Sequence, residues 1–301
     1  MNLLLTGAYS FTPGQIESFQ ALGYKTLFVQ DERVPLEIDT STIDCVVCNN
    51  LFLYNKIEDF KSLKFIQLTS AGLDRVPLDY IKSHEIDLHN ARGVYSIPMA
   101  EWALLKILEI YKDSLHFMQA QNNRKWLKER NIMELSGRTA SVVGMGSVGK
   151  EVARRLKAFG VKILGIDIFE IKEDYVDRFF HINDIDKALS LSDIIVLTLP
   201  LTGQTRYLIN KERLNSMRQD AVIINISRGA VIQETALIDA LNTGKFRGVA
   251  LDVFEQEPLE SNSPLWSMKN VFISPHNSFI SDKNNERLFR LMYDNLKNYI
   301  S

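Results

Sequence analysis

The stretch that decides the fold is SVVGMGSVGKEV, residues 141–152. Three glycines, Gly144, Gly146 and Gly149, follow a short β-branched run and precede residues with helical spacing. A G-x-G-x-x-G pattern alone is weak evidence, because a purely structural turn can carry the same glycines. The pattern points to a nucleotide only between a strand and a helix, with an acidic residue about twenty positions further on.

The residues around this turn meet that requirement. ASVV before it is typical of a strand, SVGKEVARRLKAF after it of a helix, and the next strand, KILGID, ends in Asp167. Gly144 then allows a sharp turn, Gly146 leaves room for a pyrophosphate, and Gly149 lets the helix approach the sheet. The helix N-terminus adds unpaired N–H groups and the positive end of its dipole. The turn is therefore predicted to bind a dinucleotide.

Asp167 indicates which dinucleotide. A carboxylate at the end of the second strand can accept both hydrogen bonds of a ribose diol. No Arg or Lys follows Asp167 before Lys172, whereas an NADP enzyme would need positive charge there for the 2′-phosphate. We therefore predict NAD as the cofactor. The cofactor-binding turn also includes the three residues between and after its first glycines, Met145, Ser147 and Val148.

Length, composition and charge exclude several classes of protein. The chain has 301 residues, 46% of them hydrophobic, which is enough for two domains with real cores. The net charge of −2 argues against a nucleic-acid partner, since such proteins are usually basic. The start, MNLLLTGAYS, lacks the basic flank and length of a signal peptide, and no apolar run could span a bilayer. We expect a cytoplasmic protein with no nucleic-acid or membrane partner.

Two cysteines, Cys45 and Cys48, form a C-x-x-C pattern in DCVVCNN. This spacing can indicate a metal or redox site, but the sequence contains no second pair. The surrounding residues are typical of a strand, in which positions three apart face opposite sides. We predict two buried apolar side chains and no metal site.

The rest of the chain alternates between strand-like and helix-like stretches. Continuous apolar runs indicate strands buried on both faces, and therefore parallel α/β sheets. The first hundred residues contain NLLLTG, KTLFVQ, DCVVCNN, KFIQLTS and IDLHN, and the second half contains TASVVG, KILGID, DIIVLTLP, AVIINISRG, GVALDVF and NVFISPHN. Strands that alternate with helices at this length predict right-handed crossovers in doubly wound sheets.

One stretch without glycine, residues 97–122, is predicted to be a single long helix that is apolar over most of its circumference. Such a helix is buried on several sides, so it could bridge two domains or lie in a dimer interface. The basic segment after it, NNRKWLKER, could bind nucleic acid, but a solvated loop is the commoner explanation. The last helix carries an apolar stripe through Leu288, Leu291, Met292, Leu296 and Tyr299.

Polar residues gather where the strands of the second half end. Ligands of an open parallel sheet lie outside the carboxyl ends of its strands. Pro200, Arg228, Asp252 and His276 stand at such ends, and Glu257 follows Asp252 by five positions. A single histidine or arginine is usually a packed or solvated residue, but their collection at one edge indicates a site.

These residues suit hydride transfer to a 2-keto acid. Arg228 offers a planar cationic fork for the carboxylate and carbonyl of such a substrate. His276 titrates in the range required of a proton donor to the carbonyl oxygen. Glu257 beside it would favour the imidazolium and fix the ring. We predict Arg228, Glu257 and His276 as the catalytic residues.

The sequence resembles the D-isomer-specific 2-hydroxyacid dehydrogenases over nearly its whole length. The resemblance rests on VVGMGSVGKEVARRLKAFGVKILGID, LPLTGQTRYLI, VIINISRGAVIQETALIDAL, GVALDVFEQEPL and FISPHNS, in order and at family spacing. It implies a flavodoxin-like substrate-binding domain of residues 1–95 plus 280–301. A doubly wound NAD-binding Rossmann domain, residues 96–279, would be inserted into it.

The resemblance also implies roles for individual residues. In the family, the arginine of SRG binds the substrate, the histidine of SPH is the acid/base, and the glutamate before proline supports it. TSAGLD resembles the loop whose N–H groups hold the substrate carboxylate, which implies that Ser70, Ala71 and Gly72 contact substrate. Pro200 and Thr205 match positions near the cofactor, and Asp252 matches the residue at the nicotinamide amide. The family is dimeric through the long helix and the segment after it, which implies a homodimer.

The sequence leaves the physiological substrate open. The general likeness is to family members that reduce glyoxylate, hydroxypyruvate or similar small keto acids, and phosphoglycerate dehydrogenases belong to the same family. Phe52 and Tyr54 could line the pocket, although core positions are favoured, and Ser96 receives no role. The family also includes NAD(H)-sensing corepressors, so a binding protein on the same fold is the alternative to an enzyme.

Overall fold

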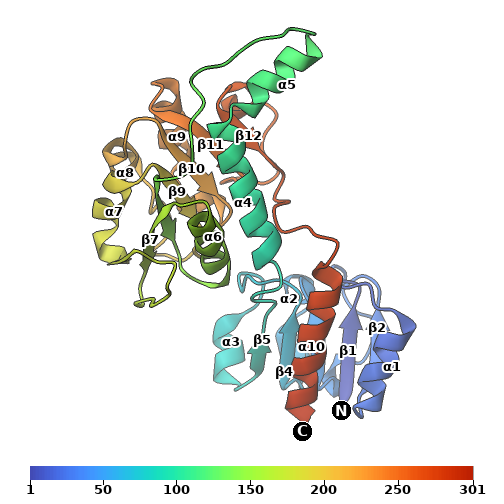
Figure 1. Ribbon diagram of the computed structural model, residues 1–301. Coiled ribbons are helices and arrows are strands. Elements are labelled where there is room, and N and C mark those ends of the chain that lie inside the picture. The colour runs from blue at the N-terminus through green and yellow to red at the C-terminus, as the bar shows by residue number, and fades with distance from the viewer. Residues whose placement is uncertain (301) are drawn as a thin grey trace. The chain divides into compact units, whose positions relative to one another are not determined.

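The computed structural model describes residues 1–300 and divides them into two compact units. The first unit comprises Met1–Tyr95 together with residues 281–300, and the second comprises Ser96–Ile280. The predicted domain boundary near residue 280 differs from this division by one residue. Each unit contains one parallel sheet with helices on its faces (Figure 1).

The first unit has a five-stranded sheet in the order β2-β1-β3-β4-β5, and all its pairings are parallel. Its three central strands are almost fully buried, as expected when helices cover both faces. The strands are β1 (Asn2–Thr6), β2 (Lys25–Val29), β3 (Cys45–Cys48), β4 (Phe65–Leu68) and β5 (Asp87–His89). The helices are α1 (Pro13–Ala21), α2 (Leu51–Tyr54), α3 (Leu78–Ser83) and α10 (Asn284–Ile300), with single 3₁₀ turns at Thr40–Thr42 and Ile57–Asp59.

Two apolar layers lie on opposite faces of this sheet. Phe19 of α1 and the stripe of α10 form one layer, and Ile81 of α3 belongs to the other. Cys45 lies in the first layer and Cys48 in the second, and both are free thiols with no exposed surface. This confirms the prediction of two buried apolar cysteines facing opposite sides of a strand. Burial raises the pKa of the Cys45 thiol to about 12.

The second unit has a seven-stranded parallel sheet in the order β12-β11-β10-β9-β6-β7-β8. Six of its strands were predicted. They are β6 (Thr139–Val143), β7 (Lys162–Asp167), β9 (Ile194–Leu197), β10 (Ala221–Asn225), β11 (Phe246–Leu251) and β12 (Val271–Ile273). The seventh, β8 (Arg178–His181), was missed because it is a short edge strand in which only Phe180 is buried.

Helices cover both faces of this second sheet. Val152 and Leu156 of α6 are buried against one face, and Leu189 of α7 and Leu237 of α9 against the other. The helices are α4 (Ser96–Tyr111), α5 (Ser114–Asn122), α6 (Ser147–Ala158), α7 (Ile185–Leu191), α8 (Lys211–Ser216) and α9 (Glu234–Asn242), with 3₁₀ turns at Ile182–Asp184, Gly229–Val231 and Pro264–Ser267.

The prediction of one uninterrupted helix over residues 97–122 is wrong. The stretch forms α4 and α5, which are separated at Asp113, where φ is +51°. A left-handed residue ends a helix, and aspartate tolerates that conformation better than most side chains. Among residues 1–300, no helix is both long enough and apolar enough to pass through a membrane.

Candidate active site

The predicted catalytic and cofactor-binding residues of the second unit follow the carboxyl ends of its parallel strands. Because all the strands point the same way, these ends form one edge of the sheet. In sheet order the edge carries His276 after β12, Asp252 after β11, Arg228 after β10, Pro200 after β9, Gly144 after β6 and Asp167 at the end of β7.

The three glycines of the turn between β6 and α6 have different surroundings. Gly144 has φ +93°, and a Cβ atom there would lie 2.8 Å from the Leu199 Cα. A Cβ at Gly149 would lie 2.0 Å from the Gly144 carbonyl oxygen. A Cβ at Gly146 would meet no atom within 4 Å. The packing of the chain therefore requires glycine at 144 and 149. The chain leaves space for a side chain at Gly146, so only a bound ligand would require glycine there.

The backbone of the turn offers hydrogen-bond donors. Within residues 1–300, the N–H groups of Gly146, Ser147 and Val148 have no acceptor. They lie at the N-terminus of the twelve-residue helix α6, where the helix dipole favours an anion. Met145 differs from these residues, because its side chain is buried and its N–H donates to Asp167 at 2.6 Å.

Asp167 supports the turn and keeps capacity for a ligand. Its Oδ2 accepts from Met145 N, and its Oδ1 accepts from the N–H of Ile168 at 2.7 Å. Each carboxylate oxygen has a further lone pair for a hydroxyl donor. The side chains of Ile168 and Phe169 beside it are largely exposed. The open amides, the unobstructed Gly146 and this carboxylate fit a dinucleotide.

Pro200 and Thr205 lie in the segment after β9, the strand that pairs with β6 beside the glycine turn. The Thr205 Oγ1 donates to the Pro200 carbonyl at 2.7 Å and accepts from the N–H of Thr202 at 2.7 Å. Thr205 therefore closes the segment into a compact turn, and Pro200 is exposed on it.

His276 and Glu257 form a hydrogen-bonded pair. The His276 Nδ1 lies 2.8 Å from the Glu257 Oε2, and the Glu257 Oε1 accepts from the N–H of Phe254 at 3.1 Å. Both side chains are about one-third exposed. In the part of the chain described here, the His276 Nε2 has no hydrogen-bond partner, so this nitrogen is free for a substrate. The pair thus has the geometry of an oriented acid/base.

Asp252 holds the loop that carries His276. The carboxylate is 1% exposed and accepts from the Ser274 hydroxyl, from Asn277 N at 2.7 Å and from Ser278 N at 3.0 Å. The N–H of His276 donates to the Asp252 carbonyl at 2.8 Å. The resemblance alone assigns Asp252 to the nicotinamide amide; its contacts within the chain show a further task, which is to position His276.

Arg228 is half-buried on a turn that the strand ends fix. Its guanidinium donates to the Ser227 carbonyl at 2.8 Å, and the Asn225 amide donates to the Arg228 carbonyl at 3.1 Å. A Cβ at Gly229 would lie 1.8 Å from the Phe254 carbonyl carbon, so only glycine allows this approach. The arginine turn therefore packs directly on the loop that carries Glu257.

Two glutamates that were not predicted from the sequence fasten this same loop. The Glu255 carboxylate accepts from Glu234 N at 2.6 Å and from the Tyr207 hydroxyl at 2.9 Å, and the Glu255 N–H donates to the Glu234 carboxylate at 3.2 Å. Burial raises the pKa of Glu234, and the charge of Glu255 adds to this rise. The two residues are 21 positions apart in the chain, and no local pattern connects them.

The predicted substrate loop, Ser70–Gly72, lies in the first unit after β4. The Asn90 amide donates to the Ala71 carbonyl at 2.7 Å, and Ala91 N donates to the Ser70 carbonyl at 2.9 Å. Within residues 1–300, the N–H groups of Ser70, Ala71 and Gly72 have no acceptor. Three successive N–H groups without an acceptor are available to an anion such as a carboxylate.

Three further residues had uncertain roles. Phe52 is half-buried and its ring centroid lies 5.5 Å from that of Phe60, which is a core contact. Tyr54 is 52% exposed, so the preference for a core position was wrong there. Ser96 begins α4, and its buried hydroxyl has no hydrogen-bond partner among the described residues.

Comparisons with known proteins agree with this arrangement. Residues 104–278 match the family model described as D-isomer specific 2-hydroxyacid dehydrogenase, NAD binding domain. A glyoxylate reductase of Thermofilum pendens is 36% identical over 78% of this chain and 71% of its own. A hydroxypyruvate reductase of Blautia hydrogenotrophica is 27% identical over 100% of this chain and 97% of its own.

A solved structure extends the likeness to the whole fold. It is a D-isomer specific 2-hydroxyacid dehydrogenase from Xanthobacter autotrophicus Py2 in complex with NADPH and MES, and it is 27% identical with a TM-score of 0.81. The alignment covers 99% of this chain and 94% of the other. With its NAD-binding domain and this fold, the chain belongs to the D-isomer specific 2-hydroxyacid dehydrogenases, NAD-dependent oxidoreductases that act on CH–OH groups.

Proposed function

We propose that the protein transfers a hydride between NAD(H) and a small D-2-hydroxy acid and its 2-keto acid, of the glyoxylate, hydroxypyruvate or phosphoglycerate type. The observation that carries this proposal is the 2.8 Å pair of His276 and Glu257 on the same sheet edge as Arg228 and the open glycine turn. The names of the two reductases among the relatives support the first two substrate types.

The residues divide the work as follows. Each unit offers one group suited to the substrate acid. In the first unit the unpaired N–H groups of Ser70–Gly72 suit its carboxylate, and in the second unit the Arg228 guanidinium is a planar fork for a carboxylate and carbonyl. The His276 Nε2 donates a proton to the carbonyl oxygen in reduction and takes it back in oxidation. Glu257 accepts from Nδ1, which fixes the orientation of the ring. NADH, when bound, would supply the hydride to the carbonyl carbon, while this proton goes to the carbonyl oxygen.

The proposal includes a preference for NAD(H) over NADP(H). The Asp167 carboxylate would repel a 2′-phosphate, and the next cation in the sequence is Lys172. The relative from Xanthobacter was solved with NADPH, so the preference needs its own measurement. Comparison of kcat/KM for NADH and NADPH with one keto acid provides it, and equal values would contradict the assignment of Asp167.

We further propose a homodimer with residues 97–122 in its interface. Much of α4 is buried in its own unit, through Ala103, Ile107 and Ile110. The exposed apolar residues are Leu105 on α4, Phe117 and Met118 on α5, and Trp126 after it, which is 94% exposed. Exposed apolar groups of this size are typical of an interface. Light scattering at micromolar concentration tests the proposal, and a strict monomer would contradict it.

NADH oxidation with a panel of 2-keto acids tests the function itself. We expect turnover with at least one small keto acid and its loss in His276→Gln. Failure with every keto acid, while NADH still binds tightly, would instead indicate an NAD(H)-sensing protein on the same fold. Failure of both binding and turnover would contradict the assignment of the glycine turn as well.

A further inference from the structure

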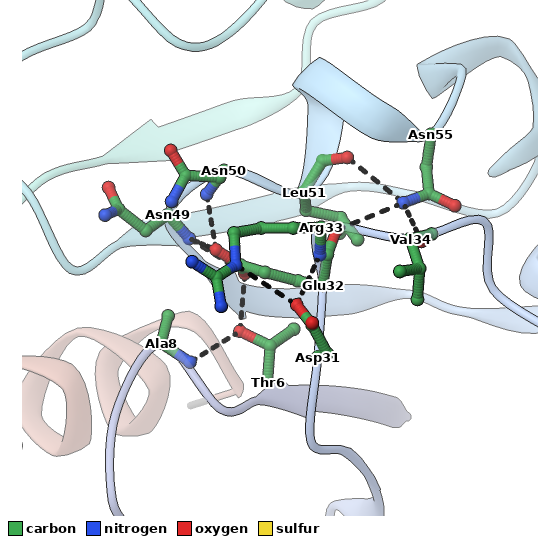
Figure 2. A network of polar contacts seen from close by, with 10 residues as sticks. All are labelled: Thr6, Ala8, Asp31, Glu32, Arg33, Val34, Asn49, Asn50, Leu51 and Asn55. Carbon is green, nitrogen blue, oxygen red and sulfur yellow. Dashed lines mark hydrogen bonds and ion pairs between the residues drawn. The ribbon is translucent and has the colours of Figure 1, made fainter.

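One buried charge in the first unit has no task in the proposed reaction. Glu32 is 4% exposed, and its carboxylate accepts from the Thr6 hydroxyl at 2.6 Å, from Asn49 N at 3.1 Å and from Asn50 N at 2.5 Å (Figure 2). All three partners are donors, which is the environment of an ionised carboxylate. Burial raises the pKa of the neighbouring Cys48 thiol, and the negative charge of Glu32 adds to the effect.

The position of this carboxylate in the sheet is the one where α/β folds bind ligands. Thr6 ends β1, and Asn49 and Asn50 directly follow β3. β1 and β3 are neighbours in the sheet, whereas β2, which lies between them in the chain, pairs on the other side of β1. A switch point of this kind, where successive strands leave in opposite directions, is where ligands of open sheets bind. Here the chain's own carboxylate occupies it.

The same carboxylate lies close to the loop proposed to hold the substrate. β3 pairs with β4, and Thr69 N donates to the Cys48 carbonyl at 2.9 Å at the point where both strands end. Glu32 binds the two residues after Cys48, and Ser70–Gly72 follow Thr69. Neighbouring strands are about 4.8 Å apart, so the carboxylate and the open amides of the loop are within roughly 10 Å of each other.

We propose that Glu32 is a specificity residue that selects small 2-keto acids with an uncharged far end and disfavours those with a second anionic group. The proposal rests on the proposed function, because it takes Ser70–Gly72 as the site of the substrate carboxylate. Every substrate brings that first charge, so its repulsion by Glu32 is common to all of them. A distal phosphate or carboxylate that lies toward Glu32, within about 8 Å of its carboxylate, adds a second repulsion.

The size of this effect follows from Coulomb's law. At a separation of about 8 Å and an effective dielectric constant of about 40, two unit charges repel by an amount equivalent to roughly fivefold in a rate or binding constant. The selection is therefore a preference of about that size, larger for a doubly charged phosphate. Glyoxylate- and hydroxypyruvate-type substrates are favoured over the phosphoglycerate type.

Glu32→Gln removes the charge while the contacts can be kept. The glutamine carbonyl oxygen can accept from Asn49 N and Asn50 N, and its amide can donate to the Thr6 hydroxyl oxygen, which is also an acceptor. Glu37→Gln is the matched control, since it removes the same charge from an exposed residue five positions away. Thermal unfolding of all three proteins reports whether the fold is kept.

The test is the ratio of kcat/KM for hydroxypyruvate to that for its 3-phosphate, in wild type and both variants. We expect Glu32→Gln to lower this ratio by about fivefold or more, and Glu37→Gln to leave it unchanged. An equal loss with both substrates would show that Glu32 only supports the loop, and would overturn the proposal. Equal ratios in all three active proteins would overturn it too, while the proposed function would stand.

A binding measurement separates this proposal from the catalytic one. Oxamate and N-oxalylglycine are non-reducible 2-keto acid analogues, and only the second has a distal carboxylate. Calorimetry on the NADH-loaded protein gives both Kd values even where no turnover is found. We expect Glu32→Gln to improve binding of N-oxalylglycine relative to oxamate by about fivefold. An unchanged ratio, or no binding of either compound to any of the proteins, would overturn the proposal.

Discussion

Both units place the switch point of a parallel sheet at its carboxyl edge, but the two switch points are filled differently. In the second unit, β6 has β7 on one side and β9 on the other, and a turn with Gly146 at its centre leaves its N–H groups open. In the first unit, β1 has β2 on one side and β3 on the other, and the Glu32 carboxylate takes up the N–H groups there.

The difference shows that the sheet alone does not decide whether its switch point binds a ligand. A glycine exposes backbone donors to a ligand anion, whereas a buried glutamate supplies the anion from within the chain. The buried carboxylate also has to keep every donor contact, since an unpaired buried charge would cost several kcal/mol. Function therefore has to be argued from the residues at each strand end and not from the fold.

The carboxyl edge of the second sheet, whose glycine turn leaves N–H groups unpaired, is called the open edge. The largest effect that we expect there comes from Arg228→Lys. A lysine keeps the charge but cannot make a planar two-pronged contact with a keto acid. We expect kcat/KM for the best keto acid to fall by about a hundredfold, roughly 2.7 kcal/mol of transition-state stabilisation. Steady-state kinetics with NADH at saturation measures this. A loss of less than about threefold would mean that Arg228 is not the substrate fork.

The next effect compares two glycines of the same turn. Gly146→Ala adds a methyl group that meets no atom of the chain, so we expect the unfolding temperature to change little. The methyl group would face the pyrophosphate, and we expect NADH affinity to fall by about tenfold or more. Gly144→Ala, with its Cβ 2.8 Å from Leu199 at positive φ, should instead destabilise the unit.

Fluorescence titration with NADH and thermal unfolding of the two variants test this pair. If Gly146→Ala binds NADH as tightly as wild type, the open amides of the turn do not hold the pyrophosphate. The switch point of the second unit would then not differ from that of the first unit by binding a ligand. If Gly146→Ala were as unstable as Gly144→Ala, the glycine would have a structural task that its empty surroundings do not show.

The open edge could be predicted from the sequence because its signals are local. The glycine turn and its following Asp167 fit a pattern within one βαβ unit, and the strands before them are continuous apolar runs. The pair of His276 and Glu257 was predicted because a carboxylate beside a histidine suits the chemistry, and the distance of 2.8 Å agrees with it. These residues lie 19 positions apart, on neighbouring strand ends.

The role of Glu32 at the carboxyl edge of the first sheet could not be predicted. Nothing near Glu32 in the sequence distinguishes it from a solvated glutamate. Its partners are 26 positions before it, at Thr6, and 17 positions after it, at Asn49. The break at Asp113 was missed for a similar reason, since neither glycine nor proline marks it. Long-range contacts and single left-handed residues leave no periodic signal in a sequence.

A third prediction concerns the buried cysteine thiols, which distinguish the first unit from the second. Both cysteines of the chain lie in the first unit, and the pKa of the Cys45 thiol is raised to about 12. Below about pH 9 the folded and unfolded chains both keep this proton, so the thiol leaves stability unchanged. Between about pH 9 and 12 only the unfolded chain loses it, and stability falls by up to about 1.4 kcal/mol per pH unit.

Urea unfolding between pH 9 and 10 measures that slope. Cys45→Ala lowers stability at every pH, because it removes packed atoms, but we expect it to flatten the dependence on pH. The effect should belong to the unfolding transition of the first unit. A slope that is the same in wild type and Cys45→Ala would mean that the thiol does not titrate in this window.

The smallest effect that we expect comes from Glu257→Gln, which tests how the ring of His276 is held in place. The substitution would keep the size of the side chain and a hydrogen bond to the ring, but it would withdraw the negative charge 2.8 Å from Nδ1. The neutral amide orients the ring less firmly, because a carboxylate makes the stronger hydrogen bond to Nδ1. Because both side chains are about one-third exposed, solvent screens the charge, and we expect rates at the optimum pH within about tenfold of wild type.

A second substitution shows whether Glu257 acts through His276. If it does, Glu257→Gln should cause almost no further loss in a chain that already carries His276→Gln, in reduction and in oxidation alike. The kcat/KM values of wild type, both single variants and the double variant in both directions measure this, with KM for NADH as the control. If Glu257→Gln causes the same loss in both backgrounds, Glu257 acts on the substrate or the fold and not through His276.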